Sequence, residues 1–330
     1  MRLRAYSSAD IRAAVPMTKA IESMKDVYVQ VSSGQAVIPL RLPLVVEKHS
    51  GVTLVMPAYL SGSGGLGAKL VSVFPRNRER GLPTTNALVV LIDDSTGIPL
   101  AILEGSSLTA LRTGAASGAA TDVLARRNAT TLALIGAGVQ ARTQLQAVAA
   151  VRAIRKVRVY DVDRRTAEAF AAEMSRSGRA TYGIEVVSSP GAATAEADVV
   201  ATATTSARPV FRDADIRPGT HINAVGSFKP EVQEVPGETV ARAKVVVDSR
   251  EAALAETGDL IIPRQQGLLG PDLILAELGE VLSGRAPGRV ADDEVTLFKS
   301  VGLAAQDVAV AQLVAAEADR LGMGTVIELG

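Results

Sequence analysis

The chain of 330 residues contains no cysteine and no tryptophan, and it has only two histidines. Without cysteine there can be no disulfide bond, no thiolate nucleophile and no metal held by sulfur. Two histidines are too few for an imidazole-based metal centre, so we expect no metal. Aromatic residues make up 3% of the chain and hydrophobic residues 47%. Small aliphatic side chains must therefore fill the core, as they do in tightly layered α/β proteins.

The chain also lacks an excess of charge of either sign, because 35 basic residues balance 35 acidic ones. Nothing in this balance indicates nucleic acid or an anionic membrane surface as a partner. No run approaches the about 18 uncharged apolar residues of a membrane span, and the segment Met1–Tyr6 lacks the apolar core of a signal peptide. We expect a cytoplasmic protein that acts on a small molecule.

One short stretch carries the most specific signal in the chain. The predicted strand Thr130–Ile135 ends in a Gly-x-Gly-x-x-Ala motif at Gly136, Gly138 and Ala141, and a helix-spaced apolar pattern follows. Gly136 makes the turn, Gly138 lets the backbone approach a pyrophosphate, and the small Ala141 lets the helix pack closely on the strand. The helix N-terminus offers free N–H groups to the phosphates. The motif predicts a dinucleotide site; the alternative is an ordinary tight turn.

The next strand ends in Asp161, which lies 23 residues after Gly138. This spacing is close to the about 20 residues expected for the carboxylate that binds the adenosine ribose. A carboxylate there repels a 2′-phosphate, so we expect NAD(H) rather than NADP(H). Arg164 and Arg165 leave an alternative, since an arginine can accommodate the 2′-phosphate, but we interpret them as solvated residues in the first turn of the next helix.

The two halves of the chain differ in pattern. A predicted helix from Pro16 to Val31 is followed by five candidate strands without a long helix between them, which favours an antiparallel or mixed sheet. From a predicted helix at Ser106–Ala125 onward, strands and helices alternate, which favours a parallel, doubly wound sheet. The early strands are Val37–Val46, Val52–Leu60, Gly67–Phe74, Ala87–Ile92 and Leu100–Leu103, and the later ones after the glycine motif are Val157–Tyr160, Ile184–Val187, Asp198–Thr204, His221–Val225 and Lys244–Val247.

These patterns predict an α/β protein with a Rossmann-type doubly wound parallel sheet and a second α/β domain with a mixed or antiparallel sheet. We assign residues 1–115 to the first domain and residues 116–305 to an NAD-binding domain. A helix from Gly302 to Leu321 and a strand at Thr325–Leu329 follow. We expect residues 306–330 to complete the first domain, whose sheet edges need partners.

Six local stretches along nearly the whole chain form one more pattern: Met56–Tyr59, Gly67–Lys69, Leu108–Ala115, Gly136–Ala141, Ile222–Ser227 and Val247–Ser249. Together, and in this order, they resemble the ornithine cyclodeaminase/mu-crystallin family. That family contains NAD-dependent ornithine cyclodeaminases, an archaeal type of alanine dehydrogenase and reductases of cyclic ketimines such as Δ1-pyrroline-2-carboxylate. Its fold is a Rossmann domain plus a second α/β domain that builds a dimer interface. The resemblance therefore implies a homodimer and makes residues 1–115 the substrate-binding and dimerisation domain.

The resemblance and the motif chemistry together give a set of candidate site residues. For the cofactor, we predict contacts from Gly136, Gly138, Val139, Gln140, Asp161, Thr202, Thr204, Val225, Gly226, Gly302, Arg112 and Thr113. For the chemistry, we predict Lys69, Arg112 and Arg41.

Arg112 is the predicted clamp for the carboxylate of a 2-imino or 2-amino acid, because a guanidinium matches a carboxylate bidentately. The alternative is a surface arginine paired with Glu104. Arg41 is the second candidate clamp, and its assignment rests mainly on the resemblance. Lys69 lies in an apolar strand, where a lysine is costly unless it is paired. A lysine with a lowered pKa would suit proton exchange with an imine nitrogen; the alternative is a strand-end lysine that reaches water.

Two positions depart from the pattern of the cyclodeaminases. Those enzymes have an acid where this chain has Phe228, and another at about Leu54. An apolar pair gives no partner to a second ammonium group, so cyclodeamination of ornithine is disfavoured. We interpret His221 as structural, His49 as solvated, and Asp307 as a residue that stabilises its helix end.

The sequence therefore predicts an NAD(H)-dependent oxidoreductase that acts at C2 of a small imino or amino acid. It would reduce a cyclic ketimine or act as an alanine dehydrogenase on a keto acid. The first alternative is an ornithine cyclodeaminase, which would recycle its NAD within one turnover. The second is a non-enzymatic, mu-crystallin-like binding protein, which would have no need of Arg41, Lys69 and Arg112 together.

Overall fold

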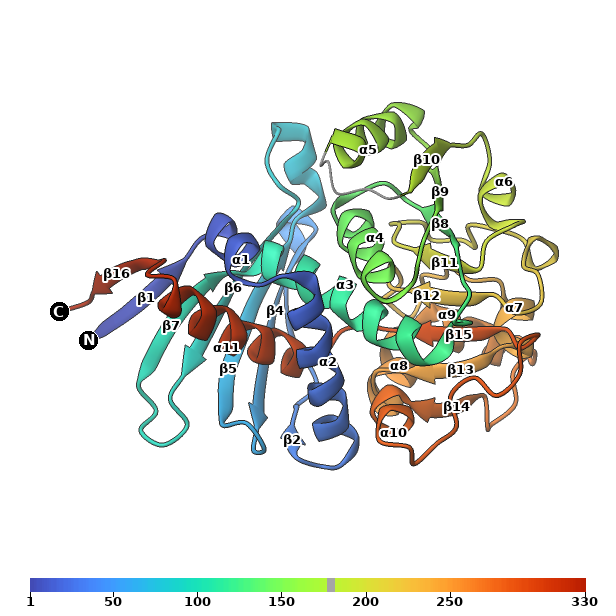
Figure 1. Ribbon diagram of the computed structural model, residues 1–330. Coiled ribbons are helices and arrows are strands. Elements are labelled where there is room, and N and C mark those ends of the chain that lie inside the picture. Colours follow the sequence, from blue (N-terminus) through green and yellow to red (C-terminus); the bar gives the residue numbers. More distant parts are fainter. Residues whose placement is uncertain (177–181) are drawn as a thin grey trace. The chain divides into compact units, whose positions relative to one another are not determined.

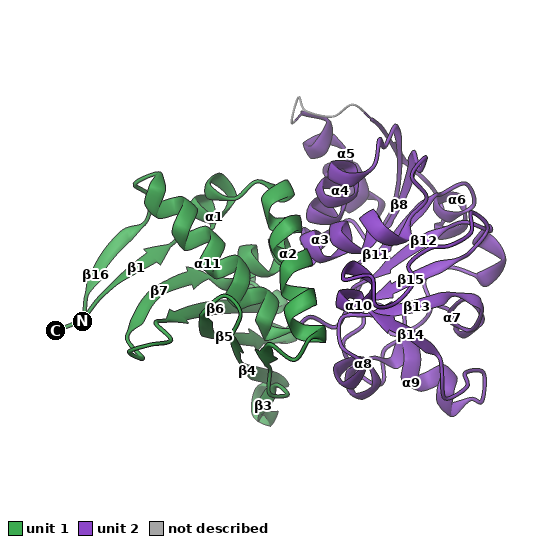
Figure 2. Ribbon diagram, turned by 60° about the horizontal axis from the view of Figure 1, so that its bottom comes forward, with its two compact units in different colours: residues 1–112, 303–330 green, residues 113–302 purple. Residues whose placement is uncertain are grey.

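The structure, a computed structural model, describes residues 1–176 and 182–330. The chain divides into two compact units, drawn in different colours in Figure 2. The first comprises Met1–Arg112 and Leu303–Gly330, and the second comprises Thr113–Gly302. Each unit contains its own eight-stranded sheet (Figure 1). Within the described residues, none of the helices combines the length and the apolar character that crossing a membrane requires.

The sheet of the first unit is mixed. Its strands lie in the order β16-β1-β7-β6-β5-β4-β2, and β3 also pairs with β4. β1 and β7 run parallel, whereas every other described pair is antiparallel. The strands are β1 (Arg2–Tyr6), β2 (Ala36–Val37), β3 (Leu42–Val46), β4 (Gly51–Leu60), β5 (Gly65–Val73), β6 (Thr85–Ile92), β7 (Pro99–Glu104) and β16 (Thr325–Glu328).

The strand predicted at Val37–Val46 is in fact two strands, β2 and β3, with an irregular segment between them. Pro39 lies in that segment, and a proline has no N–H to donate to a strand ladder. The 3-10 helices η1 (Glu47–His49) and η2 (Pro75–Arg80) connect the neighbouring strands.

Three helices accompany this sheet: α1 (Ser8–Ala14), α2 (Met17–Ser32) and α11 (Ala304–Arg320). α11 packs against β4, β5 and β6 and against α2. The first eight residues of α11 are all buried, including two polar ones, because one side of the helix lies on the sheet and another lies on α2. The return of the C-terminal segment to the first unit places this helix N-terminus over β5.

The sheet of the second unit is parallel throughout its described pairs, with the order β10-β9-β8-β11-β12-β15-β13-β14. The chain runs from β8 outward to β10 and then returns to β11 on the other side of β8. This reversal is a topological switch point, where doubly wound sheets bind their ligands. The strands are β8 (Thr131–Ile135), β9 (Lys156–Tyr160), β10 (Gly183–Val186), β11 (Val199–Thr202), β12 (His221–Ala224), β13 (Lys244–Val247), β14 (Ile274–Glu277) and β15 (Thr296–Lys299).

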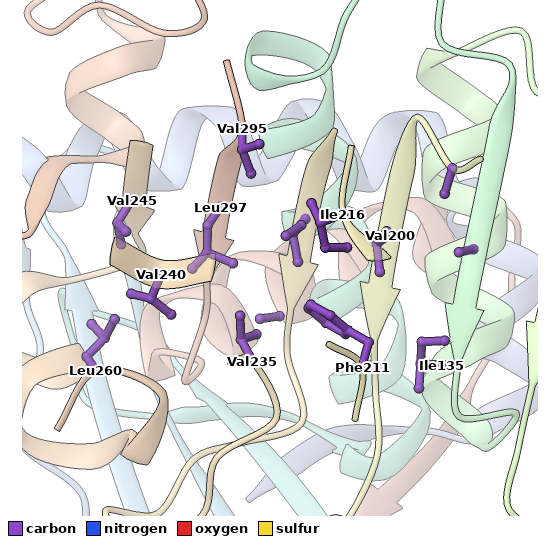
Figure 3. Close-up of a cluster of buried hydrophobic side chains, with 14 of the residues drawn as sticks. Ile135, Val200, Phe211, Ile216, Val235, Val240, Val245, Leu260, Val295 and Leu297 are labelled. Atoms are coloured by element: carbon purple, nitrogen blue, oxygen red, sulfur yellow. The ribbon is translucent and has the colours of Figure 1, made fainter. Parts of the chain in front are cut away.

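Hydrophobic clusters lie on both faces of this sheet. One cluster joins Ile135, Val200 and Leu297 of the strands to Phe211 and Leu260, as Figure 3 shows. The other joins strand residues to α4 and α5. The helices are α3 (Gly105–Leu124), which begins in the first unit and ends in the second, α4 (Val139–Val151), α5 (Arg164–Arg176), α6 (Pro190–Thr194), η3 (Asp213–Asp215), α7 (Gly237–Arg242), α8 (Arg250–Glu256), α9 (Gly258–Gln265) and α10 (Leu278–Leu282).

The expected combination of a doubly wound parallel sheet and a mixed sheet is confirmed. Two of the parallel strands, β14 and β15, were not among the predicted ones. Both are four residues long and carry a charged residue at their ends, Glu277 and Lys299. A short segment with a terminal charge does not show the continuous apolar run that marks a buried strand, so only the tertiary structure identifies them.

Candidate functional site

The glycine motif of the second unit forms an open turn between β8 and α4. Gly136 has a φ of +94°, and a Cβ there would lie 2.7 Å from the carbonyl oxygen of Ala203, so the turn requires glycine. At Gly138, the residue before α4, a Cβ would meet no atom within 4 Å, and no side chain caps the helix. Arg142 donates to the carbonyl oxygen of Gly138 at 2.9 Å. The helix N-terminus is thus free for a phosphate.

Other predicted residues of this region lie around the same turn. Val139 opens α4 with 68% of its surface exposed, whereas Ala141 is completely buried. Gln140 follows in the first turn of the helix, and its carbonyl oxygen accepts from the Thr143 hydroxyl. The small residue at position 141 allows the close contact of helix and strand on which the motif depends. These features fit a dinucleotide pyrophosphate at the turn.

Asp161 follows β9 and bonds to the glycine turn itself. One carboxylate oxygen accepts from the backbone N–H of Ala137 at 2.9 Å, and the other accepts from the N–H of Asp163 at 3.0 Å. The carboxylate is therefore held beside the turn, where the adenosine ribose of a dinucleotide binds in this fold. Arg164 pairs with Glu168 at 2.8 Å, and the side chain of Arg165 is 91% exposed. Neither arginine approaches Asp161 as an ion-pair partner.

The loops that follow β11 and β12 are joined by Glu234, a residue that the sequence did not single out. Its carboxylate accepts from the Thr202 hydroxyl at 3.2 Å, from the Thr204 N–H at 2.7 Å and from the Gly226 N–H at 2.7 Å. A Cβ at Gly226 would collide with this carboxylate. Val225, beside it, donates its N–H to the Thr202 carbonyl oxygen at 3.0 Å. Burial raises the pKa of Glu234.

Two further buried acids hold backbone at the same edge of the sheet. Asp259 accepts from the backbone N–H of Glu234 at 2.6 Å and forms an ion pair with Lys299 at 2.9 Å. Asp248 accepts from the N–H of Gly302 at 2.7 Å and from the Ser300 hydroxyl at 2.9 Å. Four of the five residues predicted at the ends of β11, β12 and β15 are therefore fixed by buried carboxylates: Thr202, Thr204, Gly226 and Gly302.

The last predicted cofactor residue, Thr113, is the first residue of the second unit. It lies on α3, is buried, and its carbonyl oxygen accepts from the Gln144 amide of α4 at 3.4 Å. A Cβ at the next residue, Gly114, would lie 2.6 Å from Thr143. The two helices therefore approach closely at this point.

The first unit contains a buried cluster of charges around Asp307. One carboxylate oxygen of Asp307 lies 2.6 Å from Lys69 Nζ, and the other lies 3.2 Å from Arg112 Nε. Lys69 is 2% exposed, Arg112 6%, and Asp307 is completely buried. Lys69 comes from β5, Arg112 from α3 and Asp307 from the first turn of α11. The structure thus joins two residues that the sequence singled out for catalysis.

The interpretation of Asp307 as a residue that stabilises a helix end is therefore incomplete. Both oxygens of its carboxylate form ion pairs with cations from other elements, because α11 lies on the sheet beside Lys69. Pairing of Arg112 with Glu104 is wrong as well: Glu104 accepts from the backbone N–H groups of Ser106 and Ser107 at 2.7 and 2.8 Å. It caps the start of α3.

Gln306 completes the support of Arg112. Its side-chain oxygen accepts from Arg112 Nη1 at 3.1 Å and from the Leu303 N–H at 2.7 Å, and its amide nitrogen donates to the Tyr28 hydroxyl at 2.6 Å. Within the described part of the chain, the third nitrogen of this guanidinium, Nη2, donates no hydrogen bond. The guanidinium is thus fixed on two sides and keeps a donor for a ligand.

The cluster carries more positive than negative charge. Burial lowers the pKa of Lys69 to about 8; Asp307 opposes this shift, and Arg112 and the half-buried Arg41 add to it. Burial also disfavours the charged form of Asp307, but Arg112 and Lys69 outweigh it and keep the pKa of the carboxyl below its usual value. Two buried cations, Lys69 and Arg112, against the one carboxylate of Asp307 can accept one more anion, such as a substrate carboxylate.

The two histidines match their interpretation from the sequence. His221 is completely buried, and its ring nitrogens bond to Thr296 and Asn223 at 3.0 and 3.2 Å. His49 is exposed in η1. Among the described residues, no group of three or more His, Cys, Asp or Glu side chains could hold a metal ion.

Comparison with known proteins places this chain among enzymes of one family. Residues 4–320 match the ornithine cyclodeaminase/mu-crystallin family. The chain belongs to this family. A Δ1-pyrroline-2-carboxylate reductase of Bacillus cereus is 43% identical over 324 residues, which cover 98% of each chain.

Two solved structures are similar over their full length. The Thermococcus litoralis Δ1-pyrroline-2-carboxylate reductase in complex with NADH and L-proline is 45% identical, with a TM-score of 0.94 over 98% of this chain and 99% of that one. An archaeal alanine dehydrogenase dimer with bound NAD is 35% identical, with a TM-score of 0.92 over 100% of both chains.

These comparisons confirm the expected family, the expected class of NAD(H)-dependent oxidoreductase acting on imino and amino acids, and NAD as the cofactor. The roles of individual residues stay predictions. Sequence reasoning missed Glu234, Asp259 and Lys299, and it assigned no role to Asp248, which lies in the stretch Val247–Ser249. No local pattern marks Lys299 as buried, because it ends a segment too short to be recognised as a buried strand.

The position of Asp161 predicts the cofactor preference. Asp161→Ser should weaken NADH binding by about 1.5–3 kcal/mol, the value of hydrogen bonds to a charged group, and should remove the repulsion of NADPH. Binding of both cofactors, followed by fluorescence titration, measures the ratio. Asp163→Ser is the matched control and should keep the wild-type preference. Tighter binding of NADPH than of NADH by the wild-type protein would contradict the assignment.

Proposed function

We propose that this protein reduces Δ1-pyrroline-2-carboxylate to L-proline with NADH. The observation that carries the proposal is the buried cluster of Lys69, Arg112 and Asp307, with Arg41 close enough to affect Lys69. It supplies both a site for a carboxylate and a proton beside it. The full-length similarity to two Δ1-pyrroline-2-carboxylate reductases supports the same substrate.

The two arginines bind the substrate carboxylate in this proposal. Arg112 offers its guanidinium in a fixed orientation, because Asp307 and Gln306 hold two of its nitrogens. Arg41 adds a second positive charge from the segment just before β3. Together they would hold the ring in one orientation. This fixed placement lowers the entropic part of the barrier.

Lys69 donates the proton in this proposal. Reduction of the imine requires a hydride at C2 and a proton at nitrogen. NADH, when bound, supplies the hydride. Lys69, with its pKa lowered to about 8, carries a proton at neutral pH and gives it up more readily than a solvated lysine does. Asp307 keeps the ammonium in place at 2.6 Å.

The second unit binds the cofactor in this proposal. The turn at Gly136 and Gly138 holds the pyrophosphate and Asp161 holds the ribose. The residues at the ends of β11, β12 and β15 face the nicotinamide half, as the switch-point rule implies. The first unit then serves as the substrate-binding and dimerisation domain, as its charge cluster supports.

Two apolar residues argue against cyclodeamination of ornithine. Leu54 lies in β4, and Phe228 is 41% exposed in the loop after β12. Neither side chain can pair with the second ammonium group of ornithine. An unpaired charge in a site costs several kcal/mol, so a substrate without that group is favoured.

Steady-state kinetics test the substrate. We expect NADH-dependent reduction of Δ1-pyrroline-2-carboxylate with a kcat/KM roughly a hundredfold above that for pyruvate plus ammonia, since a site shaped for a ring discriminates by about this factor. NADH absorbance gives both rates. A higher kcat/KM for pyruvate plus ammonia would make the protein an alanine dehydrogenase. Conversion of ornithine to proline without net consumption of NADH would make it a cyclodeaminase.

The lowered pKa of Lys69 predicts the pH dependence of the reaction. The protonated form donates, so kcat for reduction should fall as the pH rises through about 8. Lys69→Met should lower kcat by about 10²–10⁴, as loss of a general acid does, with NADH affinity intact. Lys69→Arg is the control: it keeps the charge and should abolish the fall near pH 8. A Lys69→Met protein with wild-type kcat would exclude this role.

We infer that the protein forms a homodimer through the mixed sheet. A row of apolar residues crosses four neighbouring strands of the first unit in register: Leu42, Val55, Leu70 and Leu88. Leu42 is 58% exposed, Leu70 43% and Leu88 38%. An exposed apolar row on a sheet is typical of an interface. A dimer is also the state named for the similar archaeal alanine dehydrogenase.

Sedimentation velocity tests the dimer. The wild-type protein should sediment as a dimer at micromolar concentration, and Leu70→Asp should shift it toward the monomer because it places a charge in a desolvated interface. Val162→Asp is the matched control, since Val162 is 92% exposed in the second unit, and it should leave the dimer intact. A folded, monomeric wild-type protein would contradict the inference.

The expected cytoplasmic location stays a prediction.

A further inference from the structure

The second unit contains a cavity of about 760 Å³ away from the glycine turn. It lies beside the C-terminal end of α3, next to the residues that precede β8 and β15. Gly136 follows the carboxyl end of β8, whereas Asn128, which lines the cavity, precedes its amino end. The five residues of β8 span roughly 16 Å. The cavity is therefore at the opposite edge of the parallel sheet from the cofactor turn.

The charged residues of the cavity wall are mostly arginines. Arg126, Arg127, Arg152 and Arg289 line it together with two acids, Asp122 and Asp292, which leaves an excess of two positive charges. The volume lies within the range of about 300–1,000 Å³ that is usual for small-molecule sites. A cavity of this size and charge favours an anion.

Two of the arginines keep donors that the described residues do not use. Arg127 is exposed and makes no ion pair or hydrogen bond through its guanidinium within the described part of the chain. Arg126 binds Asp198 through Nη2 at 2.5 Å, but its Nε is buried without a partner. Asp198 also binds Arg217 at 2.5 Å, so one carboxylate serves two guanidinium groups. Unpaired donors beside a positively charged cavity are typical of an anion site.

The other two arginines form a fixed wall. Arg289 donates to the carbonyl oxygens of Leu124 and Glu294, and Arg152 donates to those of Thr121 and Ala125. Most of their partners are neutral, so their hydrogen bonds are satisfied while their charge is not cancelled. Arg152 has one ion pair, with Asp122 at 3.3 Å.

The charges around the cavity affect the pKa values of Arg289 and His221. Burial lowers the pKa of Arg289; the carboxylates of Glu294 and Asp292 oppose this shift, and the charges of Arg126 and Arg152 add to it. Burial also lowers the pKa of the nearby His221 to about 3, with contributions from Arg289 and Arg152. A bound anion would relieve the repulsion among these cations.

We propose that this cavity is a second ligand site, which binds a small dianion, either a phosphate ester or a dicarboxylate, with Arg127 as a direct ligand. The excess of two positive charges matches a phosphate ester, which carries about −1.5 to −2 at neutral pH. Guanidinium groups match the oxygens of both ligand types. The site is independent of the cofactor turn and of the Lys69 cluster, so the proposed reductase activity can fail without affecting it.

Isothermal titration of the protein saturated with NADH tests the site, because the bound cofactor blocks the glycine turn. The probes are glycerol 3-phosphate and succinate, titrated separately at low ionic strength. We expect one site per chain for at least one of them, and the tighter probe identifies the ligand type. Arg127→Glu should weaken binding by at least roughly tenfold, because it removes charge-assisted bonds and reverses the charge.

Two further variants make the result specific. Arg264→Glu reverses the charge of another exposed arginine of the second unit, outside the cavity, and should leave the affinity within twofold. Lys69→Met should also leave it unchanged. The proposal is overturned if neither probe binds at millimolar concentration, if Arg127→Glu binds as tightly as the wild type, or if Lys69→Met abolishes binding, which would place the anion at the Lys69 cluster.

Discussion

The first unit depends on the burial of one carboxylate, that of Asp307, between Lys69 and Arg112. Three charged side chains in a protein interior are stable only as a set, because removal of one partner leaves an uncompensated charge that costs about 3–5 kcal/mol. The set forms only when α11 lies on the mixed sheet and places its first turn beside β5. The C-terminal helix α11 is therefore part of the first unit's core, since its Asp307 supplies the negative charge that stabilises the buried Lys69 and Arg112.

The second unit uses buried carboxylates in another way. Glu234, Asp248 and Asp259 accept mainly from backbone N–H groups and hydroxyls in loops that follow strands. A loop residue has no ladder partner, and a buried N–H without an acceptor costs free energy. Each carboxylate removes that cost for several loop groups at once. The ends of β11, β12 and β15 thus become rigid at the edge where a doubly wound sheet binds its ligand.

Much of the second unit could be predicted because its signals are local. The turn at Gly136 needs a positive φ and the contact at Ala141 needs a small side chain, so the residue types themselves report the geometry. The acids beside these elements could not be predicted in the same way. Asp307 bonds to a residue 195 positions away, and Glu234 bonds to loops on two different strands. Nothing in the neighbouring sequence distinguishes such an acid from one that caps a helix or faces water.

The sequence by itself determined the cofactor class, the family and the alternation of strands and helices. The glycine motif and the alternation depend on residues that are close along the chain, and short local stretches carry the family resemblance. The tertiary structure alone decided which acid pairs with Lys69, which short segments become β14 and β15, and which arginines share the cavity beside α3. Those outcomes depend on pairing across long sequence separations, where burial removes water and makes the identity of each charged neighbour decisive.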